Sequence, residues 1–171
     1  CSSDLAAIIG AGPMGGGIAI CFANAGIPVT VVDATPAALA RGLGVVGETY
    51  EGMVKRGRLT PEDKATRMAC ISGALDYAAV ADADVIIEAV FENPQLKKEI
   101  FARLEQVAKP GAVLATNTST LDIEDIATAV RRKGDVIGLH FFSPANVMPL
   151  LEVVRTKDTR SEEHTSELQS R

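Results

Sequence analysis

A histidine and a glutamate in the carboxyl-terminal third of the chain are the residues best suited to catalysis. His140 closes a short apolar run, Val136 to His140, which predicts a strand, and Glu152 lies twelve residues later in a second apolar run. The intervening loop is too short for a helical crossover. The second run, Leu150 to Arg155, is therefore predicted to return antiparallel and to bring its carboxylate beside the imidazole.

A His–Glu pair fits the oxidation of an alcohol. The imidazole can take the hydroxyl proton while hydride leaves the carbon, and the carboxylate can fix the tautomer and stabilise the imidazolium. A lone histidine is by default structural, so a catalytic role rests on this pairing and on the polar run Asn117 to Thr120, which follows another predicted strand. His164 lies in a tail unlike the rest of the chain and is left out of the chemistry.

A glycine-rich turn near the amino end is the second chemical feature. Gly10, Gly12 and Gly15 have the G-x-G-x-x-G spacing, between the apolar run Leu5 to Ile9 and a helical pattern. In a dinucleotide site the first glycine permits the tight turn, the second lets the backbone approach the pyrophosphate, and the third lets the helix pack on the strand. The N–H groups and partial positive charge of the helix N-terminus then face the phosphates.

The residue after the second predicted strand distinguishes between cofactors. Asp33 follows Val29 to Val32, where a carboxylate can take both hydroxyls of the adenosine ribose. It would repel the 2′-phosphate of NADP, and no cation follows it directly, so NAD is preferred. The glycine motif, with Pro13, would also fit FAD. A membrane-spanning helix is the alternative for this uncharged stretch, but six glycines and two prolines interrupt it.

Composition limits the class of protein. The 171 residues are 47% hydrophobic and 23% charged, with a net charge of −5 and no basic stripe, which argues against nucleic acid as a partner. The three cysteines show no metal-binding spacing, so we expect no metal site and reduced thiols in an intracellular protein. A chain that begins on Cys1 suggests a fragment.

Strand-like and helix-like patterns alternate along the chain. This alternation predicts an α/β fold of the Rossmann type, a doubly wound and mostly parallel sheet with an antiparallel last strand. The predicted helix Pro36 to Arg58 ends in basic residues, Lys55, Arg56 and Arg58. These residues either form a solvated helix end that complements the helix dipole or contact an anionic ligand. The remaining predicted helices are 61–68, 77–80, 94–108 and 121–130, and the remaining strands are 70–72, 84–90 and 112–116.

The last twelve residues break from this pattern. RSEEHTSELQSR, residues 160–171, has no apolar periodicity and resembles the translation of a sequencing adapter. We therefore expect one domain over residues 1–159 and a non-native or disordered tail over residues 160–171, without function.

Four motifs in order resemble one family. They are GAGPMGGGIAICFANAG, EAVFEN (Glu88 to Asn93), NTSTL (Asn117 to Leu121) and HFFSPANVMPLLEVV (His140 to Val154). Together they are similar to the NAD-binding domain of L-3-hydroxyacyl-CoA dehydrogenases, above all the dehydrogenase part of multifunctional β-oxidation enzymes. The resemblance covers about Leu5 to Arg155 and implies NAD-dependent oxidation of (S)-3-hydroxyacyl-CoA to 3-ketoacyl-CoA.

The resemblance also implies roles for individual residues. His140 would be the catalytic base, Glu152 its partner, and Ser119 a contact to the substrate. Lys55 and Arg56 fall in the helical region that meets CoA in the family. Ser143 stands where many members have asparagine. The cofactor-binding set is Gly10, Gly12, Met14, Gly15, Asp33, Ala89, Glu92, Lys97, Asn117 and Ser143.

Members of this family carry a helical second domain that completes the acyl-CoA cleft and makes a dimer, and this chain does not contain it. We therefore expect the fragment alone to be inactive and the whole enzyme to be a homodimer or part of a multifunctional complex. A cytoplasmic location is expected, or an organelle if the source is eukaryotic, with no membrane span. The alternatives are an NAD-binding structural protein like the lens crystallins, against which the retained site residues argue, and a 3-hydroxyisobutyrate-type dehydrogenase, which would leave the HFF…E pattern unexplained.

Overall fold

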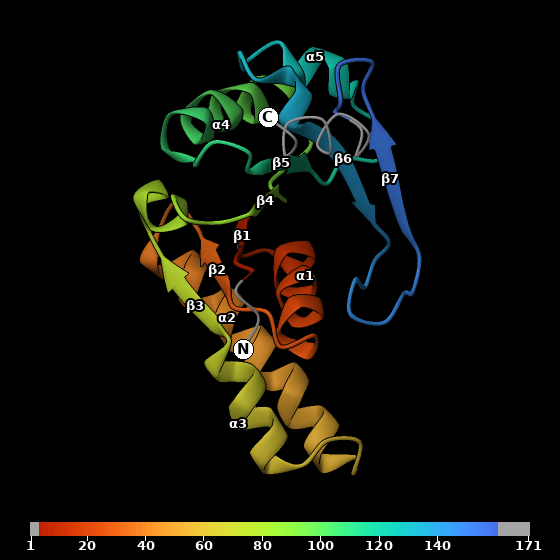
Figure 1. Ribbon diagram of the computed structural model, residues 1–171. Coiled ribbons are helices and arrows are strands. Elements are labelled where there is room, and N and C mark those ends of the chain that lie inside the picture. The colour runs from red at the N-terminus through yellow and green to blue at the C-terminus, as the bar shows by residue number, and fades with distance from the viewer. Residues whose placement is uncertain (1–3, 161–171) are drawn as a thin grey trace, which may run out of the picture.

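Seven short strands form the centre of the structure. The computed structural model describes residues 4–160 (Figure 1). The strands are β1 (Ala6–Ile9), β2 (Val29–Val32), β3 (Ile71–Ala74), β4 (Val85–Glu88), β5 (Val113–Thr116), β6 (Val136–Phe141) and β7 (Leu151–Arg155). The α-helices are α1 (Pro13–Asn24), α2 (Pro36–Lys55), α3 (Pro61–Ala69), α4 (Pro94–Val107) and α5 (Ile123–Ala127), and two 3-10 turns are η1 (Tyr77–Val80) and η2 (Lys133–Asp135).

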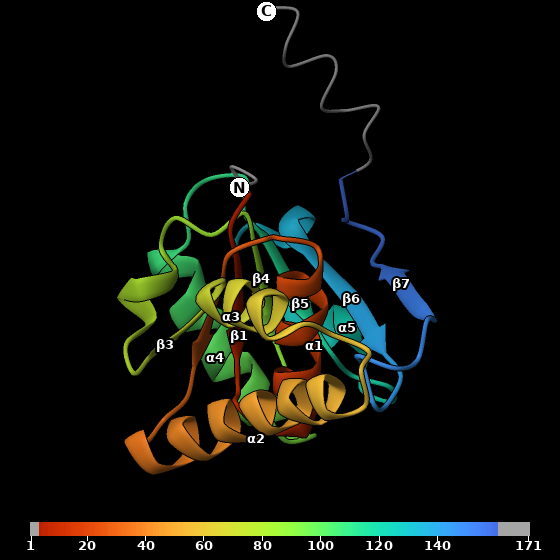
Figure 2. The ribbon, with the colours of Figure 1, turned by 90° about the horizontal axis from the view of Figure 1, so that it is seen from below.

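The strand order is β3-β2-β1-β4-β5-β6-β7, so the chain winds outward from β1 in both directions. All neighbouring strands are parallel except β6 and β7, which are antiparallel. Figure 2 shows β7 at the outer edge beside β6, at the opposite side of the sheet from β3. The predicted Rossmann-type sheet and its antiparallel last strand are confirmed.

Two apolar layers cover the sheet, because successive side chains of a strand point to opposite faces. Ala7 and Ile9 of β1 pack in the layer that contains the buried residues of α4 and α5. Ala6 and Ile8 pack in the other layer, with the buried residues of α1. Figure 1 shows α4 and α5 together on one side, and α2 and α3 as a projecting helical hairpin.

The helices start where short polar side chains can cap them. Thr35, Thr60 and Asn93 each accept a hydrogen bond from the backbone N–H three residues later. A proline follows each of these caps and occupies a first-turn position that needs no N–H partner. The α1 helix differs, since its N-cap is Gly12 and no side chain caps it.

Two helices end three residues before their predicted ends, for reasons that lie in the backbone. The α5 helix ends at Ala127 instead of residue 130, because the next three N–H groups bond to carbonyls three residues back and tighten the chain. The α2 helix ends at Lys55 instead of residue 58. Gly57 there adopts a φ of 66°, and its N–H donates to Val54 O at 2.9 Å.

The predicted tail begins one residue too early. The N–H of Arg160 donates to Gly134 O at 3.1 Å, and its guanidinium pairs with the carboxylate of Asp135. Arg160 therefore packs on the domain, contrary to the prediction. The rest of the predicted tail, residues 161–171, lies outside the described residues. Within residues 4–160, no helix is both long and apolar enough to cross a membrane.

Candidate active site and cofactor crevice

His140 and Glu152 meet across the antiparallel pair β6 and β7. The two residues are register partners, and Nδ1 of His140 lies 2.9 Å from Oε2 of Glu152. A carboxylate can only accept, so Nδ1 carries a proton, and in the neutral ring Nε2 is the nitrogen with a free lone pair. The predicted contact between the two side chains is confirmed. The contact holds the His140 ring at Nδ1 and leaves Nε2 without a partner in this pair.

Two further residues hold the histidine and its strand end. The Phe142 ring packs against the imidazole, with centroids 4.5 Å apart and planes tilted by 41°. Asn117 Oδ1 accepts the N–H of Phe141 at 3.0 Å, and the Asn117 N–H donates to Glu88 O at 2.8 Å. Asn117 therefore ties together the carboxyl ends of β4, β5 and β6. This role is one that the sequence did not indicate.

Ser119 lies two residues beyond Asn117 in an ordered loop. The Thr118 hydroxyl donates to Glu92 Oε2 at 2.9 Å and accepts the N–H of Leu121 at 3.0 Å. Thr118 is buried, whereas Ser119 is exposed. The loop thus leaves Ser119 exposed at the edge of the sheet where β6 ends, and it fixes Glu92 on the same edge.

The glycine turn has the shape that a pyrophosphate requires. Gly10 has a φ of 108°, which suits glycine alone. An added Cβ on Gly15 would lie 1.8 Å from Gly10 O, whereas one on Gly12 would meet nothing within 4 Å. The helix therefore packs tightly on the turn at Gly15, while open space lies at Gly12 beside the uncapped N-terminus of α1. These residues fit a dinucleotide.

Asp33 is fixed at the end of β2 by two backbone groups. Its Oδ2 accepts the N–H of Ala11 at 2.8 Å, and its Oδ1 accepts the N–H of Ala34 at 2.7 Å. Each oxygen keeps a further lone pair for a ribose hydroxyl. The bond to Ala11 also links this carboxylate to the glycine turn, so the two predicted halves of the cofactor site lie side by side.

Lys97, which the resemblance assigns to the cofactor site, forms a buried ion pair with Glu88. Its ammonium is buried and bonds to both carboxylate oxygens of Glu88, at 2.7 and 2.8 Å. The side chain is 0% exposed, so in this structure it offers no surface to a cofactor. The expected contact of Lys97 with a cofactor stays a prediction. The sequence analysis did not predict the contact between Glu88 and Lys97, nor the hydrogen bond that Thr116 donates to Glu88.

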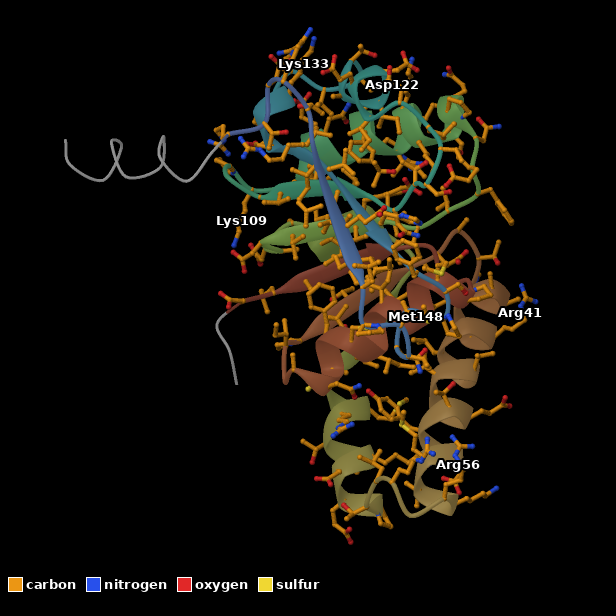
Figure 3. The ribbon with its side chains drawn as sticks, turned by 90° about the vertical axis from the view of Figure 1, so that its right-hand side faces the viewer. Arg41, Arg56, Lys109, Asp122, Lys133 and Met148 are labelled. Carbon is orange, nitrogen blue, oxygen red and sulfur yellow. The ribbon has the colours of Figure 1, made fainter. Side chains whose placement is uncertain are left out.

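The other predicted residues are spread along the crevice and beyond it. Ala89 continues the sheet bonding through its N–H to Ile9 O at 2.8 Å, and Met14 is half-buried in the first turn of α1. Ser143 is exposed in the β6–β7 loop. Lys55 and Arg56 are exposed at the tip of the α2–α3 hairpin, where Figure 3 labels Arg56 apart from the Met148 loop.

The β6–β7 loop is held on α1. Cys21 Sγ donates to Ala145 O at 3.3 Å, and burial raises the pKa of this thiol above its ordinary value. An added Cβ on Gly17 would lie 3.1 Å from the Ala145 methyl carbon, so the loop also sits closely on the helix there. The loop that follows His140 is therefore fixed to the helix that begins the glycine turn.

Two surface hollows within residues 4–160 lie away from the His–Glu pair. One of about 640 Å³ lies between α4 and the chain around Arg131 and Arg132. There the Arg132 guanidinium donates to the carbonyls of Glu105, Ala108 and Lys109 and closes the end of α4. This arrangement is structural, and the hollow shares no residue with the His–Glu pair.

The sequence model of the family described as 3-hydroxyacyl-CoA dehydrogenase, NAD binding domain, matches residues 5–169. A peroxisomal fatty acid beta-oxidation multifunctional protein from Oryza sativa subsp. japonica is 44% identical over 153 residues. That alignment covers 90% of this chain but only 21% of the relative, so the chain spans about a fifth of that protein.

Solved structures agree with this match. The 3-hydroxybutyryl-CoA dehydrogenase of Escherichia coli superposes with a TM-score of 0.91 at 38% identity, covering 99% of this chain and 36% of that one. The dehydrogenase part of multifunctional enzyme 1 from C. elegans superposes with a TM-score of 0.84 at 34% identity, covering 98% and 38%.

These comparisons overturn one expectation. The plant relatives are named as peroxisomal or glyoxysomal enzymes. The cytoplasmic location expected from the sequence is therefore wrong.

The family match covers nearly the whole chain, and the glycine turn and Asp33 have the geometry of a dinucleotide site. The predicted cofactor, NAD, and the predicted resemblance are both confirmed. This chain belongs to the family of 3-hydroxyacyl-CoA dehydrogenase NAD-binding domains.

Proposed function

We propose that this chain forms the cofactor-binding part of an enzyme that oxidises (S)-3-hydroxyacyl-CoA to 3-ketoacyl-CoA with NAD in fatty-acid β-oxidation. The observation that carries the proposal is the 2.9 Å contact between His140 Nδ1 and Glu152 Oε2. It lies at the carboxyl edge of the sheet, where ligands bind in open α/β folds. The family match and the names of the relatives support the substrate class.

Catalysis rests on the free nitrogen of His140. Its Nε2 accepts the proton of the substrate hydroxyl, since Nδ1 is already bonded to Glu152. The carboxylate then stabilises the imidazolium that forms. Phe142 stacks on the ring and limits its rotation. Bound NAD supplies the hydride acceptor. Ser119, exposed on the same edge, contacts the hydroxyl and thioester region of the substrate.

Cofactor binding uses the open side of the glycine turn. The pyrophosphate would face Gly12 and the N-terminus of α1, and Asp33 would take the ribose hydroxyls. Asn117 and Glu92, in the loops that follow β5 and β4, would lie beside the nicotinamide. Lys55 and Arg56 at the hairpin tip contact the anionic groups of CoA.

The chain supplies only part of the active site. It spans 21% of the rice relative and 36% of the Escherichia coli enzyme, which leaves most of each protein outside the alignment. We infer that the chain alone binds NAD(H) without turning over acyl-CoA, and that the full-length enzyme is a dimer or part of a multifunctional complex.

The test uses a full-length enzyme that carries this chain. His140→Gln and Glu152→Gln should each reduce kcat by about 10²–10⁴-fold, the range of general acid–base catalysis, while leaving the NADH dissociation constant within about twofold. Glu48→Gln is the control, because Glu48 is an exposed glutamate on α2 far along the chain from the pair. Turnover of either site variant close to that of the control would refute the dyad.

A further inference from the structure

The β6–β7 loop is attached to the rest of the domain at two points. Where β6 ends, the N–H of Phe141 donates to Asn117 Oδ1 at 3.0 Å. Further on, Ala145 is 5% exposed and is the only buried residue of the stretch 142–150. Ser143, which the family resemblance assigns to the cofactor site, lies between the two attachments and is exposed. The position of Ser143 therefore depends on where Ala145 is held.

Ala145 packs on the α1 seat, the surface that Gly17 and Cys21 form one helical turn apart. An added Cβ on Gly17 would lie 3.1 Å from the Ala145 methyl carbon and 3.3 Å from the Ala145 nitrogen. Cys21 Sγ donates to Ala145 O at 3.3 Å. The seat thus contacts the side chain and both polar backbone atoms of Ala145, and a larger residue at position 17 would push the loop away from α1.

The reaction proposed above needs a proton acceptor on β6 and a hydride acceptor held by α1 in a fixed relation. Figure 1 shows the loop that leaves β6 beside α1, the helix that follows the glycine turn. The Phe142 ring, three residues before Ala145, packs on the His140 imidazole with centroids 4.5 Å apart. A shift of the loop would therefore move both this ring and Ser143. A misplacement of about 1 Å at a reacting centre costs on the order of 10²-fold in rate.

We propose that Gly17, Cys21 and Ala145 are positioning residues, which hold the β6–β7 loop on α1 in the geometry that the reaction needs. In that geometry Ser143 and the His140 ring would face the nicotinamide end of the bound cofactor. The proposal rests on the proposed function. The three residues touch neither cofactor nor substrate in it, and act through the loop alone.

The first test compares turnover in a full-length enzyme that carries this chain. Gly17→Ala should lower kcat about tenfold, because the loop must move, and should leave the KM of the hydroxyacyl-CoA within about twofold. The double variant Gly17→Ala with Ala145→Gly should recover at least about threefold in kcat, since the methyl group that meets the new Cβ is gone. A double variant that is slower than Gly17→Ala would overturn the proposal.

Gly44→Ala is the control for this comparison, because an added Cβ on that helical glycine would meet nothing within 4 Å. It should leave kcat unchanged. If Gly17→Ala turns over within about twofold of Gly44→Ala, the seat does not position the loop for catalysis.

Binding to the whole chain separates the two ends of the cofactor. ADP-ribose reaches only the glycine turn and Asp33, so Gly17→Ala should bind it within about twofold of the unmodified chain. NADH, which also reaches toward Ser143, should bind the variant about threefold more weakly. An equal loss for both ligands would show that Gly17 acts on the glycine turn, against the proposal.

The Cys21 thiol reports on the loop without any cofactor. Its hydrogen bond to Ala145 O and its burial should make it react slowly with a disulfide reagent such as DTNB. Gly17→Ala should speed the modification of Cys21 at least about threefold, and peptide mapping distinguishes this thiol from Cys70. Modification at the unchanged rate would contradict the displacement of the loop.

A second pair of variants applies if Gly17→Ala does not fold. Cys21→Ala removes the donor and should lower kcat about threefold, whereas Cys21→Ser keeps a donor and should restore it. Equal turnover of these two variants would overturn the proposal. Failure of the proposed function would show itself separately, as an unmodified enzyme that does not oxidise (S)-3-hydroxyacyl-CoA although Gly17→Ala still exposes the Cys21 thiol.

Discussion

Asp33 combines recognition of the ribose with support of the glycine turn. Its carboxylate accepts the N–H of Ala11, so the same oxygens that would take ribose hydroxyls also fix the turn. Asp33→Ala should weaken NADH binding about 10–100-fold through lost charged hydrogen bonds, and should weaken NADPH binding much less. The preference of the Asp33→Ala variant for NAD over NADP should therefore be smaller than that of the unmodified chain. Titration of both cofactors measures it.

Asp82→Ala is the matched control for this prediction, because Asp82 is an exposed aspartate at the opposite, amino edge of the sheet. It should leave both affinities unchanged. An unmodified chain that binds NADH and NADPH equally well would contradict the role of Asp33, whatever the variant does.

For individual residues, the sequence predicted those contacts that depend on spacing within one motif. The His140–Glu152 pair followed from a short loop between two strands, and the glycine turn followed from three glycines. The Glu88–Lys97 pair was missed, although a glutamate at the end of an apolar strand, nine residues before a lysine, was a visible signal. Whether that lysine would face the cofactor or the core depends on the packing of α4, which no motif records.

Two of the glycines in the α2 helix have different surroundings. An added Cβ on Gly42 would lie 2.1 Å from Ala11 O, so α2 packs against the glycine turn at this point. An added Cβ on Gly44 would meet nothing within 4 Å, and Gly44 is exposed. Gly42 therefore allows a helix far along the chain to support the cofactor turn.

Alanine at the two positions should have opposite effects. Gly42→Ala should lower the free energy of unfolding by about 1–3 kcal/mol through overpacking, and should weaken NADH binding because Ala11 must move. Gly44→Ala, two residues away, should raise the free energy of unfolding by roughly 0.5–1 kcal/mol through reduced backbone entropy in the unfolded chain. Denaturant titration of both variants measures the difference. Two variants of equal stability would contradict the packing of α2 on the turn.

Helix ends were less predictable than helix starts. Thr35, Thr60 and Asn93 precede prolines and mark the starts in the sequence. The end of α5 carries no such mark, because its last turn tightens through bonds to carbonyls three residues back. Periodicity alone continues through such a turn, which explains why the predicted helix 121–130 was too long.

For the whole molecule, the alternation of patterns predicted the class of fold but not the order of the strands. The order β3-β2-β1-β4-β5-β6-β7 depends on which apolar faces meet, and every buried strand here has an apolar face to offer. The β7 strand is exposed along its whole length, with Val153 60% and Val154 44% exposed. Its register with β6 alone fixes Glu152 beside His140.

Tyr50 should contribute to the pH dependence of global stability in the alkaline range. Tyr50 is fully buried, and its hydroxyl donates to Asn24 Oδ1 at 2.9 Å. Burial raises the pKa of Tyr50 from 10.0 to about 12, and the charge of Arg67 opposes the shift only in part. Because the folded chain holds this proton more tightly than the unfolded chain, the stabilisation is present below pH 10 and is lost as the pH rises toward 12.

Tyr50→Phe removes both the hydrogen bond and the titration. Asn24 Oδ1 still accepts a hydrogen bond from the Arg67 guanidinium at 2.9 Å, so the variant leaves no orphaned acceptor. Below pH 10 the unmodified chain should be more stable by about 1 kcal/mol, and this advantage should vanish or reverse by pH 12, a change on the order of 2 kcal/mol. Urea titrations across this range measure it. Burial also raises the pKa of a second phenol, Tyr77. The variant Tyr77→Phe, measured in the same way, distinguishes the contribution of Tyr77 from that of Tyr50. An advantage that stays constant from pH 9 to pH 12 would show that Tyr50 does not titrate with the folding of the chain.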